Sequence, residues 1–109
     1  MNRPALNLLG LCMRAGRLVS GEQAVLNAIR SGKARLVVVD TGASQNTQKM
    51  FADSCAYYDV ARIMAPEGAL GAAIGRPGRM AAAVTDEGFA RRIQELSGQE
   101  ARTATPPEG

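Results

Sequence analysis

Two short polar segments carry side chains suited to binding an anion. The first, Ser20 to Gln23, opens an expected helix. A helix start offers free backbone N–H groups and the positive end of the helix dipole, and here it has a glycine that lets another molecule come close. The second segment, Arg76 to Arg79, is an expected turn with two guanidinium groups, which bind phosphates or stack on nucleobases. Together these segments predict a binding site for a polyanion.

Positive charge is concentrated in the first third of the chain. The 109 residues have a net charge of +3, but residues 1–35 alone hold six basic side chains and one acid. Residues 36–75 have two basic and four acidic side chains, a balance of −2. Such clustering is typical of proteins that bind nucleic acids. Within the basic third, Arg17, Arg30 and Lys33 are further candidates for phosphate contacts.

The sequence lacks the motifs of common catalytic and cofactor sites. It has no histidine to act as a base near neutral pH. It has neither a dinucleotide-binding glycine loop nor a P-loop, since Gly68, Gly71 and Gly75 have the wrong spacing. Cys12 and Cys55 fall in apolar helical patterns, so we expect buried reduced thiols and no metal site. We expect no enzyme activity, no cofactor and no small-molecule substrate.

Length and hydropathy limit the class of protein. A chain of 109 residues is long enough for one hydrophobic core but too short for two. No apolar run approaches the length that spans a bilayer, and the first residues lack the pattern of a secretion signal. We expect one domain over residues 1–96 and a cytoplasmic protein without membrane contact. Residues 97–109 lack an apolar period, which predicts a disordered tail.

The central expected element is a helix that begins at Ser20 and stops near Gly32, followed by a buried strand over residues 36–39. Ser20 and Gln23 have the spacing of a capping box, in which the serine accepts a backbone N–H and the glutamine reaches back to the helix start. Apolar residues at positions 24, 25, 28 and 29 follow the helical period. The other expected helices cover residues 4–15, 44–57, 68–74 and 86–96, and the other expected strands cover residues 17–19, 60–65 and 80–84. This alternation predicts an α/β protein with a small sheet between helices.

Several motifs, in a consistent order, resemble the bacterial YlxQ family. They lie at residues 9–25, 28–37, 43–47, 57–58, 70–75 and 84–90, so that the resemblance covers about residues 5–95. The YlxQ family belongs to the superfamily of kink-turn-binding ribosomal proteins. The resemblance implies a three-layer α/β/α sandwich with a mixed sheet of about four strands. It also implies a non-catalytic protein that binds structured, kink-turn-like RNA, ribosomal RNA above all, in the translation or transcription machinery.

The resemblance also implies where RNA binds. The superfamily motif Gly-Thr-Asn-Glu-Thr-x-Lys falls on residues 21–27, where the chain keeps Gly21 and has Gln23 for the asparagine, Ala24 for the glutamate and Asn27 for the lysine. The loop before the last strand, residues 76–80 here, forms the other wall of the family's RNA cleft. The predicted RNA-binding residues are Arg17, Ser20, Gly21, Glu22, Gln23, Asn27, Arg30, Lys33, Arg76, Arg79 and Met80.

A protein-interaction module on the same fold, with weak or no RNA binding, stays open as the alternative. Its surface would be the exposed helix start or residues 40–75, and its partners would belong to the translation or transcription apparatus. An aromatic content of 4% without tryptophan leaves few strong interface anchors. The same low content disfavours recognition of single strands by stacking and favours folded RNA. The RNA site requires Gly21 and Arg79 to lie on the same side of the molecule.

Overall fold

The computed structural model describes residues 1–98. Helices and strands alternate along this part of the chain in the order α1 (Arg3–Arg14), β1 (Leu18–Ser20), α2 (Glu22–Arg30), β2 (Leu36–Asp40), α3 (Gln45–Tyr58), β3 (Arg62–Ala65), α4 (Ala69–Ile74), β4 (Ala81–Val84) and α5 (Glu87–Ser97). The predicted alternation is confirmed, with boundaries that differ by at most two residues.

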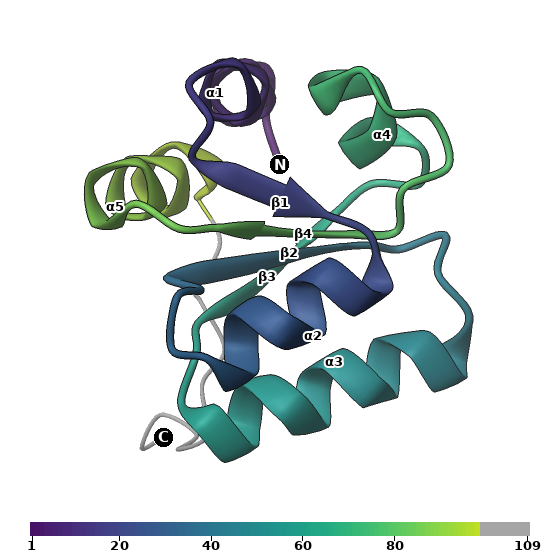
Figure 1. The fold of residues 1–109 in the computed structure, drawn as a ribbon. Helices are drawn as coiled ribbons and strands as arrows, with labels where there is room; N and C mark the ends of the chain where they lie inside the picture. The colour runs from purple at the N-terminus through teal and green to yellow at the C-terminus, as the bar shows by residue number, and fades with distance from the viewer. Residues whose placement is uncertain (99–109) are drawn as a thin grey trace.

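The four strands form one mixed sheet in the order β1-β4-β2-β3. β4 is antiparallel to both of its neighbours, and β2 and β3 are parallel. Helices α1, α4 and α5 cover one face of the sheet, and α2 and α3 cover the other (Figure 1). The predicted three-layer α/β/α sandwich is therefore confirmed. Because β4 lies between β1 and β2, the turn that precedes β4 comes next to the end of β1.

Each face of the sheet has its own hydrophobic core, and successive residues of the central strands alternate between them. Residues 36 and 38 of β2, with 82 and 84 of β4, pack under α1, α4 and α5. Residues 37 and 39, with 81 and 83, pack under α2 and α3 around Phe51. All eight strand residues are fully buried, which explains why both strands read as unbroken apolar runs.

Ser44 and Asp86, the first residues of two expected helices, cap α3 and α5. The backbone N–H of Thr47 donates to Oγ of Ser44 at 3.1 Å, and the N–H of Phe89 donates to Oδ1 of Asp86 at 2.9 Å. At the other end of α3, Asp59 has a φ of 57°, the left-handed conformation that stops a helix. The local sequence thus determines where α3 and α5 begin.

The predicted capping box at Ser20 is wrong. Ser20 is the last residue of β1 and pairs with Ala82, while α2 begins at Glu22 with no side-chain cap. The N–H of Gly21 donates to the carbonyl oxygen of Ala81 at 3.0 Å. Strand pairing with β4 therefore continues through residue 21, and the helix starts only after it.

Two further details of α2 differ from the prediction. The amide of Gln23 does not reach back to the helix start; it donates forward to Oδ1 of Asn27 at 3.0 Å. Ala24 is exposed, so the buried face consists of Val25, Ala28 and Ile29. The backbone N–H groups at the start of α2 are left without a local acceptor.

The last described residues end α5. The helix runs to Ser97, and Gly98 follows it in the left-handed conformation. These two residues belong to the segment expected to form the tail, and the rest of that segment, residues 99–109, lies outside the described residues. No helix in residues 1–98 is long and apolar enough to span a membrane.

Both cysteines are free and buried, as predicted. Burial raises the pKa of the Cys12 and Cys55 thiols from 9.0 to about 11.

Between these two pKa values the unfolded chain releases thiol protons that the native protein retains, so the free energy of unfolding falls as pH rises. We expect up to about 3 kcal/mol to be lost per thiol above pH 11, because one pKa unit is about 1.4 kcal/mol. Urea unfolding between about pH 8 and 11 measures this loss, and Cys12→Ala/Cys55→Ala should reduce it.

Candidate nucleic-acid interface

The start of α2 and the turn before β4 form one surface. The N–H of Gly21 donates to Ala81 at 3.0 Å, and the N–H of Asp40 donates to the carbonyl oxygen of Met80 at 2.9 Å. These bonds tie the turn to the C-terminal ends of β1 and β2, at the end of the sheet where α2 begins (Figure 1). We call this the helix-start surface and define it as Gly21, Glu22, Gln23, Arg76, Arg79 and Met80.

The guanidinium group of Arg79 lies directly over Gly21. A Cβ atom at position 21 would be 2.6 Å from Nη1 of Arg79, so the flexible arginine side chain would have to shift. The φ of Gly21, 97°, is one that L-residues rarely adopt. The backbone therefore requires glycine here, and the absence of a side chain lets the guanidinium group lie close. Gly21 and Arg79 lie on the same side of the molecule, as a shared ligand requires.

The helix-start surface is positively charged and has open hydrogen-bond donors. Within residues 1–98, the first amide of α2 with an acceptor is that of Val25, which donates to Gly21, so the N–H groups of residues 22–24 are unpaired. Arg76 and Arg79 are exposed, and neither forms an ion pair with another described residue. The helix dipole adds further positive potential. Glu22 is the one acid in the first turn of α2. This arrangement can bind phosphate groups.

Helix α4 holds the turn that carries the two arginines. The N–H of Arg76 donates to the carbonyl oxygen of Gly71 at 2.8 Å, and the N–H of Arg79 donates to Arg76 at 3.2 Å. A Cβ atom at position 71 would be 2.7 Å from the carbonyl oxygen of Arg76 and 3.1 Å from the nitrogen of Gly78. The helix and the turn thus pack backbone against backbone.

A buried carboxylate anchors α4 in turn. Asp40, at the end of β2, is fully buried. Its Oδ1 accepts from the N–H groups of Gly42 at 2.8 Å and Gly68 at 3.1 Å, and its Oδ2 accepts from Gly68 at 3.0 Å and Leu70 at 3.4 Å. The carboxylate satisfies backbone donors at the start of α4 and fixes the helix to the end of β2.

Arg17, Arg30 and Lys33 lie at the other end of the sheet. The carbonyl oxygen of Arg17 accepts from Thr85, just past the end of β4, whereas Met80 precedes β4. The four residues of β4 separate these ends by about 13 Å. Arg30 is the last residue of α2, eight residues or about 12 Å from its start, and Lys33 follows it by three residues. The structure does not bring these three cations to the helix-start surface.

The exposed face of α2 connects the two ends. Gln23, Asn27 and Arg30 are all exposed and are spaced four and three residues apart, so they form one row along the helix. The hydrogen bond between Gln23 and Asn27 keeps two amide groups side by side in this row. A ligand that contacts both the helix-start surface and the distant cations must therefore extend along α2, because β4 is buried inside the sheet.

Residues 5–94 match the sequence profile of the ribosomal protein L7Ae/L30e/S12e/Gadd45 family. The chain belongs to this family. Two curated relatives, from Bacillus subtilis (strain 168) and Enterococcus faecium, are both named RNA-binding protein YlxQ. The first is 43% identical over 90 residues, which are 82% of this chain and 90% of the relative. The second is 41% identical over 93 residues, which are 84% of this chain and 89% of the relative.

Solved structures of similar fold agree with this L7Ae-family assignment. A protein of unknown function from Bacillus halodurans C is 33% identical, with a TM-score of 0.85 over 90% of this chain and 100% of that one. A Giardia lamblia 15.5kD RNA binding protein has a TM-score of 0.73 over 90% and 88% of the two chains; at 20% identity it shows the fold alone. The resemblance to the YlxQ family is confirmed. The matched family is one of ribosomal proteins and the two curated relatives are named as RNA-binding proteins, which confirms the prediction of a non-catalytic family.

Sequence reasoning placed the arginines of this L7Ae-family chain in a turn but missed the residues that position them. Asp40 directly follows the expected strand over residues 36–39, and Gly71 lies within the expected helix over residues 68–74, so neither residue is predicted to hold the turn. The sequence signal for Asp40 is an aspartate directly after an apolar strand, followed by a glycine two residues later. No local signal identifies Gly71, because its neighbours belong to the following turn.

Proposed function

We propose that this protein binds structured RNA at the helix-start surface and does so without catalysis. The observation that carries the proposal is the Arg79 guanidinium over Gly21, beside the unpaired N–H groups of residues 22–24. Two independent sources of positive potential meet there, and the RNA phosphate backbone is their natural ligand. The names of the two curated relatives support this proposal.

The RNA target that we propose is ribosomal RNA in the cytoplasm, at a sharply bent, kink-turn-like element. The helix-start surface has two walls, and a bent RNA can present phosphates to both of them. Arg76, Arg79 and the N–H groups of residues 22–24 would bind phosphates. The amides of Gln23 and Asn27 both donate and accept, so they suit the edges of unpaired bases. Partner proteins from the translation or transcription apparatus would bind outside this surface.

Arg79→Ala should weaken RNA binding and make it less dependent on salt. Removing one phosphate contact should reduce the slope of log affinity against log salt by about 0.7 to 0.9. Fluorescence anisotropy measures this with fragmented ribosomal RNA and with a synthetic kink-turn hairpin over a series of salt concentrations. Arg91→Ala is the matched control, because Arg91 is exposed on α5 and has no ion pair within residues 1–98.

Two results would contradict the proposal. Wild-type protein that shows no salt-dependent binding to either RNA would exclude RNA as the ligand. Equal binding by Arg79→Ala and Arg91→Ala would exclude the helix-start surface. A preference for the kink-turn hairpin over an unbent hairpin of the same composition would support the proposed bent target.

A protein-interaction module is the second candidate, favoured by one observation. Tyr57 and Tyr58 are 82% and 42% exposed and form an edge-to-face pair with ring centroids 4.9 Å apart. Exposed aromatic side chains are common anchors of protein interfaces. The pair lies at the C-terminal end of α3, which has 14 residues, so it is about 20 Å from the first residue of α3. Specific complexes that survive nuclease treatment would favour this second candidate.

A further inference from the structure

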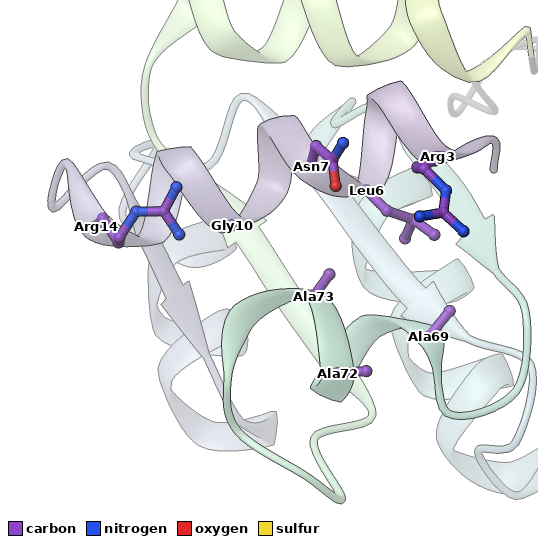
Figure 2. A pocket seen from close by; sticks show the side chains of 8 residues that line it. All are labelled: Arg3, Leu6, Asn7, Gly10, Arg14, Ala69, Ala72 and Ala73. Atoms are coloured by element: carbon purple, nitrogen blue, oxygen red, sulfur yellow. The ribbon is translucent and has the colours of Figure 1, made fainter.

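A groove runs between α1 and α4 on the face of the sheet opposite α2. Its volume is about 640 Å³. Arg3 and Arg14 of α1 lie at its two ends with Asn7 between them, and alanines of α4 form the facing wall (Figure 2). No predicted RNA-binding residue lines this groove, and the proposed helix-start surface does not include it.

Close backbone packing creates the groove. A Cβ atom at Gly10 would be 2.7 Å from the carbonyl oxygen of Ala73, so α1 and α4 contact each other through backbone at this point. The side chains that α4 presents here are the methyl groups of alanines, which fill little space. The hollow remains open because both helices contribute small residues where they meet.

The ends of the groove are positively charged. Arg3 and Arg14 are exposed, and within residues 1–98 neither forms an ion pair. The groove lining contains no acidic residue. The two Cα atoms are eleven helical residues apart, about 16 Å. Two arginine side chains that leave the helix this far apart match a linear polyanion better than a single small anion.

The groove leads to the arginine turn of the helix-start surface. Nη1 of Arg14 would be 3.7 Å from a Cβ at Gly10, near Ala73 in the last turn of α4. Helix α4 ends at Ile74, and Gly75 connects it directly to Arg76. Helix α4 therefore joins the wall of the groove to the turn that carries Arg76 and Arg79.

We propose that the α1–α4 groove binds the sugar-phosphate backbone of a second stretch of the same RNA, outside the element held at the helix-start surface. This inference rests on the proposed function. One strand advances about 3.4 Å per stacked nucleotide, so the distance between Arg3 and Arg14 corresponds to about five nucleotides. Asn7 lies between them and can donate to or accept from a ribose 2′-hydroxyl.

An RNA strand fits the groove better than a peptide helix does. A helix-binding groove needs apolar pockets for large side chains, and helix-binding interfaces are anchored by aromatic or long aliphatic residues. The lining here has no aromatic residue and one large aliphatic residue, Leu6. Charge at both ends with a shallow alanine wall between them suits a ribose-phosphate chain.

Two variants test the proposal with fragmented ribosomal RNA as the probe. Arg3→Ala/Arg14→Ala removes both cations, and Ala72→Tyr fills the groove at an exposed position without a change in charge. The double variant should bind about tenfold more weakly and have a salt slope smaller by about 1.4, the value for two phosphate contacts on a single strand. Ala72→Tyr should bind more weakly by a similar factor. Arg91→Ala/Arg92→Ala is the charge-matched control; it removes two exposed arginines from α5, of which Arg92 pairs with Glu95 at 3.5 Å.

The outcomes separate the groove from the helix-start surface. If Arg79→Ala weakens binding while the double variant matches its control, the groove proposal is wrong and the proposed function stands. If wild-type protein does not bind the RNA, the proposed function fails. If the double variant loses binding to polyglutamate but keeps its RNA affinity and salt slope, the groove binds an acidic peptide and the RNA assignment is wrong. Far-UV circular dichroism and urea unfolding establish that each variant is folded.

Discussion

Asp40→Ala should lower the free energy of unfolding by about 3–5 kcal/mol, the largest effect that we expect from a single substitution. The carboxylate is fully buried and accepts hydrogen bonds from the N–H groups of Gly42, Gly68 and Leu70. Alanine would leave the N–H groups of the exposed Gly42 and Gly68 and of the buried Leu70 without this acceptor. Since α4 begins at these donors, RNA binding should fall as well. Urea unfolding measures the stability loss, and anisotropy with ribosomal RNA measures the binding.

Asp40→Asn tests whether the carboxylate itself is needed, and Asp53→Ala is the control for the loss of an exposed aspartate. Both oxygens of Asp40 accept N–H groups, so the amide nitrogen of asparagine would face a donor whichever way it is turned. Asparagine should therefore also destabilise the fold, although it has the same shape. Asp53 is exposed and pairs with Lys49, so its loss should cost less than about 1 kcal/mol. If Asp40→Asn were as stable as wild type, the carboxylate would not be the anchor of α4.

Gly71→Ala should reduce both stability and RNA binding although residue 71 is buried and touches no ligand. The added Cβ would lie 2.7 Å from the carbonyl oxygen of Arg76 and 3.1 Å from Cα of Pro77. Both contacts are with backbone, so the turn must move. We expect a cost of about 1–3 kcal/mol from overpacking, which exceeds the gain of up to about 1 kcal/mol in helix propensity. Arg76 and Arg79 move with the turn, so RNA affinity should fall several-fold.

Gly88→Ala is the matched control for this substitution. Gly88 is also helical, but the nearest neighbour of an added Cβ is the side-chain oxygen Oδ1 of Asp86 at 3.2 Å, which caps α5 and has to give by only a few tenths of an ångström. The free energy of unfolding of Gly88→Ala should differ from that of wild type by less than about 1 kcal/mol, and the RNA affinity should not change. If Gly71→Ala unfolded at a lower urea concentration but bound RNA as tightly as wild type, α4 would not position the arginine turn.

The parts of the fold that follow from local rules could be predicted well. Ser44 and Asp86 begin helices because their side chains accept N–H groups within the same turn. Residues 36–39 form a buried strand because four consecutive apolar side chains point to both faces of the sheet, and both faces must then be covered by helices. The start of α2 could not be predicted in this way. Ser20 has a good capping pattern, but its pairing with Ala82, more than 60 residues away, keeps it in a strand.

The sequence by itself determined the family, the α/β class and the two segments that could bind an anion, because motif order, periodicity and charge are local properties. Only the tertiary structure decided which of those residues act together. It brought Arg79 over Gly21 because β4 inserts between β1 and β2, and it left Arg17 and Lys33 at the other end of the same strands. It also produced the α1–α4 groove through contact between Gly10 and Ala73, residues far apart in the chain. Distances between such residues depend on strand order and helix packing, which no local pattern encodes.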